Sequence, residues 1–263
     1  MLPEWDDIPC VIIGMIHLPP LPGSPRYGGD LRAIRDAVLR DVDALVSAGI
    51  HGLMIENFGD TPFFASRVPQ ETVAHMTSLA THVRMQTDLP IGINCLRNDG
   101  CAALAIAQAC GASFIRVNVL CGARLTDQGV IQGISADLMR LRRRLGADTI
   151  KVMADVDVKH SVPLAPVELE HEIEDTLTRG LADALIISGS GTGKITDVRK
   201  VARVAKIVPD TPIFVGSGVT PKTARNYLPH AKGLIVGTSF KEHGRVDAPV
   251  DPDRVRVLLE AIS

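Results

Sequence analysis

The densest group of chemically active side chains is the run Asp155-Val-Asp157-Val-Lys159-His160, at the end of a β-branched stretch from 150 to 158. Side chains two residues apart on a strand point to the same side, so Asp155, Asp157 and Lys159 are expected to share one face. The two carboxylates would then lie about 7 Å apart. They could hold a divalent cation through oxygen ligands, or form an acid/base pair whose mutual repulsion raises one pKa. Lys159 could form a Schiff base, neutralise an oxyanion, or simply pair with Asp157.

Other polar side chains end further apolar runs of the chain. They are His17, Glu56, Asn94, Arg116, Asn118 and Ser188. Burying such groups is costly unless they are partnered, and their recurrence at strand ends favours a functional site, with a structural ion-pair network as the alternative. The expected catalytic residues are Asp155, Asp157, Glu56, Lys159, Arg116 and His17, and the expected substrate-binding residues are Asn94, Asn118, His160 and Ser188. The cofactor is left open, with a divalent metal ion on Asp155, Asp157 and Glu56 as one alternative.

Three late loops, 188–193, 216–220 and 237–240, are rich in glycine and small hydroxyl residues, and each follows an expected strand. Glycine lets backbone N–H groups approach an oxyanion closely. Barrel proteins often bind phosphate with the loops after their seventh and eighth strands, although tight turns also favour glycine. The expected phosphate-binding residues are Gly189, Gly191, Gly216, Ser217, Gly218, Gly237, Thr238 and Ser239. Lys241 could assist as a point charge or be a solvated surface lysine.

Eight short β-branched runs that alternate with helical patterns would position these residues. The expected strands are 11–17, 52–56, 91–95, 114–119, 150–158, 184–188, 213–216 and 234–237. A helix is expected after each strand, over 30–48, 73–86, 100–110, 135–145, 167–179, 197–208, 220–227 and 251–262. Eight βα units favour a (β/α)₈ (TIM) barrel, in which the carboxyl ends of the strands carry the active site. The proline-rich loop after His17 is predicted to be either a lid or a rigid surface excursion.

The composition fits one barrel domain spanning residues 1–263. The hydrophobic fraction is 46% with only 3% aromatic residues, which predicts an aliphatic core. A net charge of −2 gives no field for attracting nucleic acid or anionic lipid. The five cysteines, an odd number, include no Cys-x-x-Cys pair, and no apolar run is long enough to span a membrane. We therefore expect a cytoplasmic protein, a homo-oligomer, with neither nucleic-acid nor membrane partners.

Segments from the first to the last expected strand resemble the BtpA family, which includes the SgcQ-like proteins. They are GMIHLPPLPGSPRYGG, GLMIENFGDTPF, IGINCLRND, FIRVNVLCGARLTDQG, ADVDVKHSVPL, ISGSGTG, VGSGVT and VGTSFK. The resemblance implies a phosphate-binding-type barrel. The family is named for a cyanobacterial member linked to accumulation of the photosystem I reaction centre, and other members occur in non-photosynthetic bacteria and archaea.

Two functions are consistent with these observations. The first is an enzyme that acts on a small phosphorylated metabolite, a sugar phosphate or nucleotide-derived sugar, by aldol/lyase, isomerase or hydrolase chemistry. The second is a non-catalytic assembly or stability factor of the BtpA type. The second function predicts a large exposed apolar patch and a polar barrel mouth locked in internal pairs.

Overall fold

Eight parallel strands close into a barrel in the computed structural model, which describes residues 1–189 and 191–263. The strands are β1 (Val11–His17), β2 (Gly52–Glu56), β3 (Ile91–Asn94), β4 (Phe114–Val117), β7 (Lys151–Val156), β9 (Ala184–Ile187), β10 (Ile213–Val215) and β11 (Gly233–Val236). Each strand lies beside the next barrel strand of the chain, and β11 closes the barrel by pairing with β1. The predicted (β/α)₈ barrel is confirmed.

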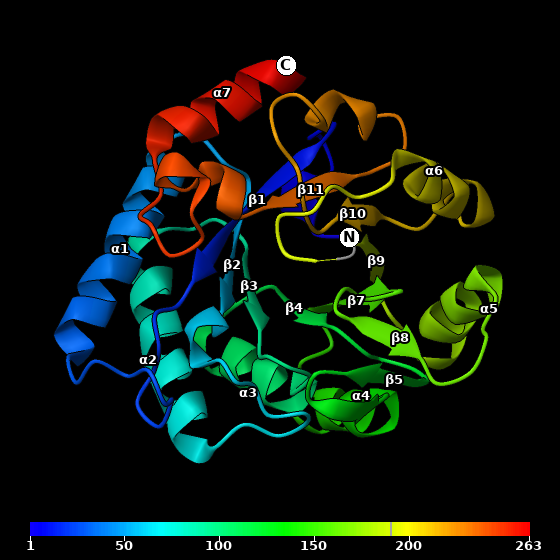
Figure 1. The fold of residues 1–263 in the computed structure, drawn as a ribbon, viewed down its shortest axis with the longest axis horizontal. Coiled ribbons are helices and arrows are strands. Elements are labelled where there is room, and N and C mark those ends of the chain that lie inside the picture. The colour runs from blue at the N-terminus through cyan, green and yellow to red at the C-terminus, as the bar shows by residue number, and fades with distance from the viewer. Residues whose placement is uncertain (190) are drawn as a thin grey trace.

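Helices surround the strands on the outside (Figure 1). They are α1 (Leu31–Ser47), α2 (Gln70–Gln86), α3 (Gly100–Cys110), α4 (Ser135–Arg144), α5 (Leu169–Glu174), α6 (Val198–Ile207) and α7 (Pro252–Ile262). Aspartates at 30, 99, 197 and 251 cap four of these helices by accepting hydrogen bonds from backbone N–H groups. A π-helical turn, Asp175–Arg179, extends α5, so the helix expected over 167–179 forms in two parts.

The prediction of a helix over 220–227 is wrong, because only the short 3₁₀ turn η4 (Ala224–Asn226) forms there. The hydroxyl of Thr223 accepts a hydrogen bond from the Thr220 backbone N–H at 3.0 Å, which favours a turn. Pro229 then prevents a helix from continuing, since proline has no N–H to donate.

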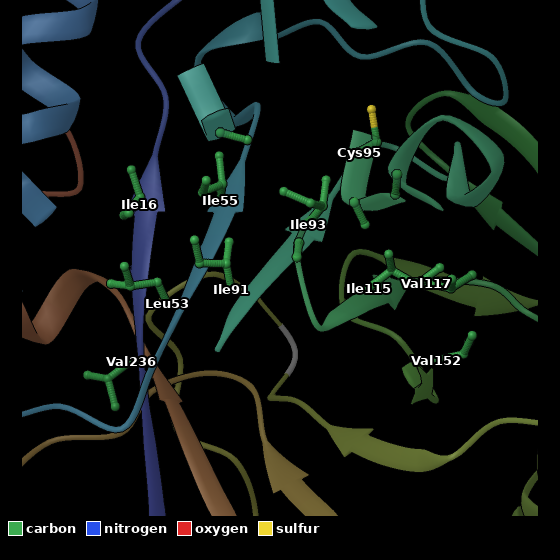
Figure 2. Packing of buried hydrophobic residues seen from close by; sticks show 14 of the residues in the cluster. Ile16, Leu53, Ile55, Ile91, Ile93, Cys95, Ile115, Val117, Val152 and Val236 are labelled. Atoms are coloured by element: carbon green, nitrogen blue, oxygen red, sulfur yellow. The ribbon is translucent and has the colours of Figure 1, made fainter. Parts of the chain in front are cut away.

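The barrel strands divide the apolar core into two layers. Inward-facing side chains such as Val11, Ile13 and Met54 form one cluster inside the barrel. Outward-facing side chains such as Ile16 and Ile55 belong to a second cluster (Figure 2). That cluster also contains residues of the helices. Side chains therefore alternate along each strand, and the inward phase continues to the carboxyl ends, where polar residues replace apolar ones.

A small antiparallel sheet covers part of the barrel mouth and was not predicted. It contains β5 (Ala123–Thr126), β6 (Gly129–Gln132) and β8 (Ser161–Pro163), in the order β6-β5-β8. Its segments come from the loops after β4 and β7. The strands expected over 114–119 and 150–158 end earlier than predicted, at Val117 and Val156. Ile131 packs beneath the sheet against Val119 and Val158.

Three further 3₁₀ turns lie in the loops at the mouth, η2 (Phe58–Asp60), η5 (Thr238–Phe240) and η6 (Glu242–Gly244), and a fourth, η1 (Pro3–Trp5), precedes β1. No helix within the described part of the chain has both the length and the apolar character needed to cross a bilayer.

Candidate functional site

Polar side chains from neighbouring strands meet at the carboxyl end of the barrel. His17 pairs in register with Glu56, Glu56 with Asn94, and Asn94 with Arg116. These four side chains point into the barrel, as do those of Met15 and the other interior residues. The structure therefore brings them together in one layer across the barrel mouth. Their chemical roles remain predictions.

Asp155 is held by a saturated set of hydrogen bonds. Arg116 donates from Nε and Nη2 to its two oxygens, each at 2.8 Å. Asn118 Nδ2 and Ser188 Oγ each add a donor at 3.1 Å. Two carboxylate oxygens offer about four lone-pair directions, and here all four are occupied. Asp155 therefore anchors Arg116 and Asn118 and has no acceptor position left for a substrate or metal.

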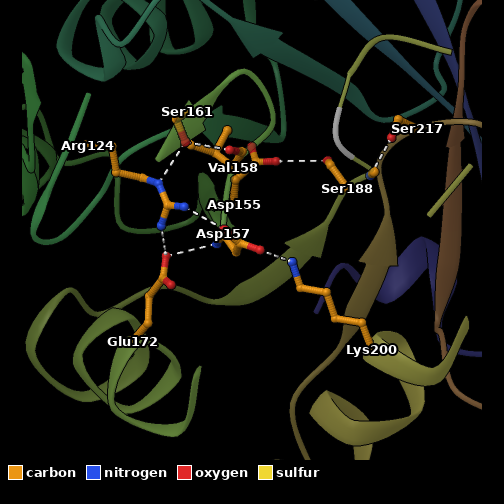
Figure 3. A network of polar contacts seen from close by, with 10 residues as sticks. Arg124, Asp155, Asp157, Val158, Ser161, Glu172, Ser188, Lys200 and Ser217 are labelled. Atoms are coloured by element: carbon orange, nitrogen blue, oxygen red, sulfur yellow. Dashed lines mark hydrogen bonds and ion pairs between the residues drawn. The ribbon is translucent and has the colours of Figure 1, made fainter. Parts of the chain in front are cut away.

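Asp157 does not share the face of Asp155, which corrects the sequence-based expectation. Strand β7 ends at Val156, and Asp157 has a left-handed backbone with φ of 51° that turns its side chain outward. Arg124 and Lys200 donate to its carboxylate at 2.5 and 2.6 Å (Figure 3). Partial burial opposes ionisation, but Lys200 and Arg124 hold the pKa of Asp157 below its usual value.

The metal site considered from the sequence is not assembled. Four donors enclose Asp155, and the Asp157 carboxylate is occupied by Arg124 and Lys200. Throughout the described residues, no group of three or more histidine, cysteine, aspartate or glutamate side chains is arranged to hold a metal ion.

Lys159 extends into the barrel mouth where Asp157 does not. Arg97 Nη2 donates to the Lys159 carbonyl oxygen at 2.6 Å and fixes the backbone there. Burial, and then the positive charge of Arg116, lower the pKa of Lys159 to about 8. Among the described residues no carboxylate lies within ion-pair distance of its ammonium. The carboxylate of Glu56 faces the same cavity, and its nearest ionisable partner is His17 Nε2 at 3.8 Å.

His17 is a neutral imidazole in this environment. Burial, followed by the charges of Lys241 and Lys159, lowers the pKa of His17 to about 3. Its ring packs against Phe58 with centroids 4.8 Å apart. Its Nδ1 atom is buried and has no hydrogen-bond partner within the described chain.

One cavity of about 240 Å³ joins the mouth residues to two of the late glycine loops. Its lining includes His17, Glu56, Arg116, Lys159, Gly216, Ser217, Gly218, Gly237, Thr238 and Ser239. Sequence reasoning missed Arg254, the third residue of α7, which also lines the cavity. Arg254 Nε donates to the Ser239 carbonyl oxygen at 2.9 Å. An arginine at the start of a final helix gives no sequence signal for this position.

Glycine is required at two positions of this cavity. Gly218 has φ of +66°, and a Cβ there would lie 2.2 Å from the Lys194 carbonyl oxygen. A Cβ at Gly237 would lie 2.6 Å from His17 Cε1. The loop after β10 therefore approaches the backbone of the loop after β9, and the loop after β11 approaches the His17 ring, more closely than a residue with a Cβ would permit.

The loop after β9 has a different position from the other two. Gly189 N–H donates to Ser217 Oγ at 2.7 Å, and neither Gly189 nor Gly191 lines the cavity. Thr192 and Gly193 line it instead. Ser190, within the predicted loop 188–193, lies outside the described residues.

Lys241 is neither a solvated lysine nor a lining residue of this cavity. It is 2% exposed, and its Nζ donates to Asp41 Oδ2 at 2.5 Å. The other Asp41 oxygen accepts the Val250 backbone N–H at 2.9 Å. This buried pair ties α1 to the segment that follows β11.

A second cavity, of about 420 Å³, shares Glu56, Lys159 and Thr192 with the first. Its other lining residues are Phe58, Phe63, Leu96, Arg97, Asn118, Asp127, Gln128 and His160. His160 is exposed and accepts the Thr192 backbone N–H at Nε2, at 3.2 Å. These two compartments of the mouth meet at Lys159, Glu56 and Thr192. Asn94 lies beneath them and donates to the Arg116 carbonyl oxygen at 3.1 Å.

Solved structures with the same fold include two enzymes of Pyrococcus furiosus. N-(5'-phosphoribosyl)anthranilate isomerase has a TM-score of 0.60 at 12% identity, covering 96% of this chain and 98% of that one. Thiamine phosphate pyrophosphorylase has a TM-score of 0.58 at 12% identity, covering 96% and 95%. At such identities the likeness shows the fold alone.

Sequence relatives are much closer. The photosystem I biogenesis protein BtpA of Synechocystis is 41% identical over 252 residues, covering 96% of this chain and 88% of that protein. An uncharacterised protein of Thermococcus kodakarensis is 47% identical over 249 residues, covering 95% and 94%. A model of the BtpA family matches residues 10–263. The chain therefore belongs to the BtpA family.

Proposed function

We propose that this protein is an enzyme that acts on a small phosphorylated metabolite. The observation that carries the proposal is the single cavity in which two glycine loops face Glu56 and Lys159. Backbone N–H groups of those loops, with the guanidinium of Arg254, suit a phosphoryl group, because they offer donors and positive charge without large side chains. The two fold relatives whose names contain a phosphorylated compound support this substrate class.

The reacting part of the substrate would lie at the junction of the two cavities. Glu56 would move protons, because its carboxylate is buried there and accepts no hydrogen bond from the described residues. Lys159 and Arg116 would stabilise developing negative charge. Asp155 would position Arg116 and Asn118 rather than exchange protons itself. Aldol/lyase, isomerase and hydrolase reactions all suit this arrangement.

A screen of phosphosugars and nucleotide-derived sugars by thermal shift, followed by turnover of the compounds that bind, tests the proposal. Glu56→Gln should lower turnover by about 10²- to 10⁴-fold with little change in folding. Glu170→Gln is the matched control, because Glu170 is an exposed carboxylate paired with Arg203 outside the barrel mouth. Turnover that survives in Glu56→Gln would remove Glu56 from the chemistry.

A cytoplasmic location and assembly into a homo-oligomer remain part of this proposal, as does the absence of nucleic-acid and membrane partners. Size-exclusion chromatography with light scattering measures the oligomeric state directly.

An assembly or stability factor is the second candidate, and one surface feature favours it. Leu125 pairs across the small sheet with Val130 on one side and Val162 on the other, and all three side chains are exposed. Such an apolar row suits contact with another protein. Each variant can be expressed in a strain that lacks the gene for this protein. The assembly function predicts that the Val162→Glu protein fails to correct the defect of that strain, whereas the Glu56→Gln protein corrects it. The enzyme function predicts the reverse.

A further inference from the structure

The backbone after β7 places one side chain of the run 157–160, that of Lys159, where the two cavities of the barrel mouth meet. Asp157 and His160 have left-handed backbones with φ of 51° and 56°, and both side chains are exposed. Between them, the carbonyl of Lys159 is fixed by Arg97 at 2.6 Å. Within the run 157–160, Lys159 lines both cavities, whereas His160 lines only the second. Its amine is thus presented to a ligand from either compartment.

The surroundings of this amine disfavour its protonated form. The side chain is largely shielded from solvent, and this burial, together with the charges of Arg116 and Arg97, outweighs the opposite effect of the Glu56 and Asp155 carboxylates on the pKa of Lys159. The pKa of Lys159 is lowered to about 8, so about a tenth of the amine is unprotonated at pH 7. For an ordinary exposed lysine, the unprotonated fraction of the amine at that pH is about four in ten thousand.

The neighbouring groups supply what a lysine nucleophile needs. Glu56 lines the same two cavities and can carry protons between nitrogen and oxygen. Arg116 is held in place beside them by its bidentate contact with Asp155. The phosphate loops lie along the wall of the first cavity, so a ligand held there by its phosphoryl group would extend toward Lys159.

We propose that Lys159 binds the carbonyl carbon of a phosphorylated aldehyde or ketone as a Schiff base, while the loops after β10 and β11 hold the phosphoryl group. This inference rests on the proposed function and narrows its substrate class to carbonyl phosphates.

The step balances with the groups at hand. The lone pair of Lys159 Nζ forms a bond to the carbonyl carbon, and the π electrons of the carbonyl move to its oxygen. Glu56 transfers a proton from nitrogen to that oxygen, giving a carbinolamine. A second proton, taken from solvent through Glu56, lets the hydroxyl leave as water, and the nitrogen lone pair closes the protonated imine. One amine, one carbonyl and one proton give one iminium and one water.

Pyridoxal 5′-phosphate is a suitable probe, because it has both an aldehyde and a phosphoryl group. The protein is treated with the probe at pH 7, reduced with borohydride, digested, and each lysine's modification rate is measured by mass spectrometry. We expect Lys159 to be modified at least tenfold faster than Lys206, which is exposed on the last turn of α6. The rate should rise with pH around a midpoint near 8. Lys159→Arg should remove this labelling, and Lys206→Arg should leave it unchanged.

Pyridoxal without the phosphate, and competition by inorganic phosphate, separate the two proposals. Slower labelling by pyridoxal and protection by phosphate would support both. Equal labelling of Lys159 by the two aldehydes would support the nucleophilic amine and overturn the phosphate pocket. If calorimetry shows that inorganic phosphate binds but Lys159 reacts no faster than Lys206, the Schiff-base inference is overturned while the proposed function stands.

Discussion

The neutral imidazole of His17 links a single residue to the acid stability of the barrel. In the unfolded chain this histidine takes up a proton near pH 6.5, whereas burial lowers its pKa to about 3 in the folded protein. Between these values the unfolded state binds more protons, so folding stability falls as the pH decreases. The loss due to His17 is about 2 kcal/mol between pH 7 and pH 5.

The variant His17→Gln should lessen this dependence, because glutamine does not titrate. Urea unfolding at pH 7 and pH 5 measures the difference, with His82→Gln, at a partly exposed position on α2, as the control. An unchanged pH dependence in His17→Gln would show that the imidazole is not held neutral.

Asp155 in β7 and Asp157 just after it should differ sharply in their effect on stability. Asp155→Asn leaves the buried Arg116 without its compensating charge, which costs about 3–5 kcal/mol. Asp157 is half exposed, so Asp157→Asn should cost about 1 kcal/mol or less. Denaturant unfolding of both variants checks this. Similar losses in the two would contradict the assignment of Asp155 as the buried anchor.

The sequence predicted this polar mouth because strand alternation is a local rule. Once Val11 and Ile13 are placed inside, His17 follows by phase, and Glu56 and Arg116 follow in the same way on their own strands. Asp157 was predicted wrongly because its left-handed backbone breaks the alternation of side chains along the strand. No residue type at this position indicates a left-handed backbone. Arg254 was not predicted as a site residue, because a tertiary contact brings it to the cavity.

At the scale of elements, the loop after β10 should be sensitive to a single methyl group. Gly218→Ala places Cβ 2.2 Å from the Lys194 carbonyl oxygen, so the backbone must shift and displace the expected phosphate donors. We expect affinity for inorganic phosphate to fall at least tenfold by isothermal titration calorimetry.

Gly122→Ala is the matched control for this variant. Gly122 has a similar φ of +71°, but a Cβ there meets nothing within 4 Å. Both variants therefore introduce the same left-handed strain, and only Gly218→Ala introduces a collision. Equal losses of affinity would attribute the effect to general backbone strain rather than to the loop.

The elements that sequence patterns predicted best are those defined by their own residues. Strand β1 and helix α3 match their expected bounds, because one begins at a β-branched run and the other ends at Gly111. The small sheet depends instead on pairing Leu125 with Val162, which are far apart in the chain. Short segments of this kind gain their structure from one another, so no local pattern predicts them.

At the scale of the whole molecule, the two ends of the barrel have separate tasks. The carboxyl end of the strands carries the polar mouth, and the amino end is closed by Trp5. This side chain is fully buried and packs against Phe114 and Phe214 with centroids 5.4 and 5.9 Å apart. Its Nε1 donates to the His51 carbonyl oxygen at 2.9 Å. Chain elements before β1 thus complete the interior core.

Trp5→Ala should therefore weaken the fold without altering the site. Removing this side chain leaves a cavity inside the barrel and costs about 3–5 kcal/mol of unfolding free energy. Met85→Ala, at a position that is 81% exposed, is the control and should have little effect. Below the unfolding transition, the Trp5→Ala protein should bind inorganic phosphate with unchanged affinity, since the glycine loops after β10 and β11 lie at the opposite end of the strands. A large loss of affinity in the folded variant would mean that the two ends are coupled through the interior core.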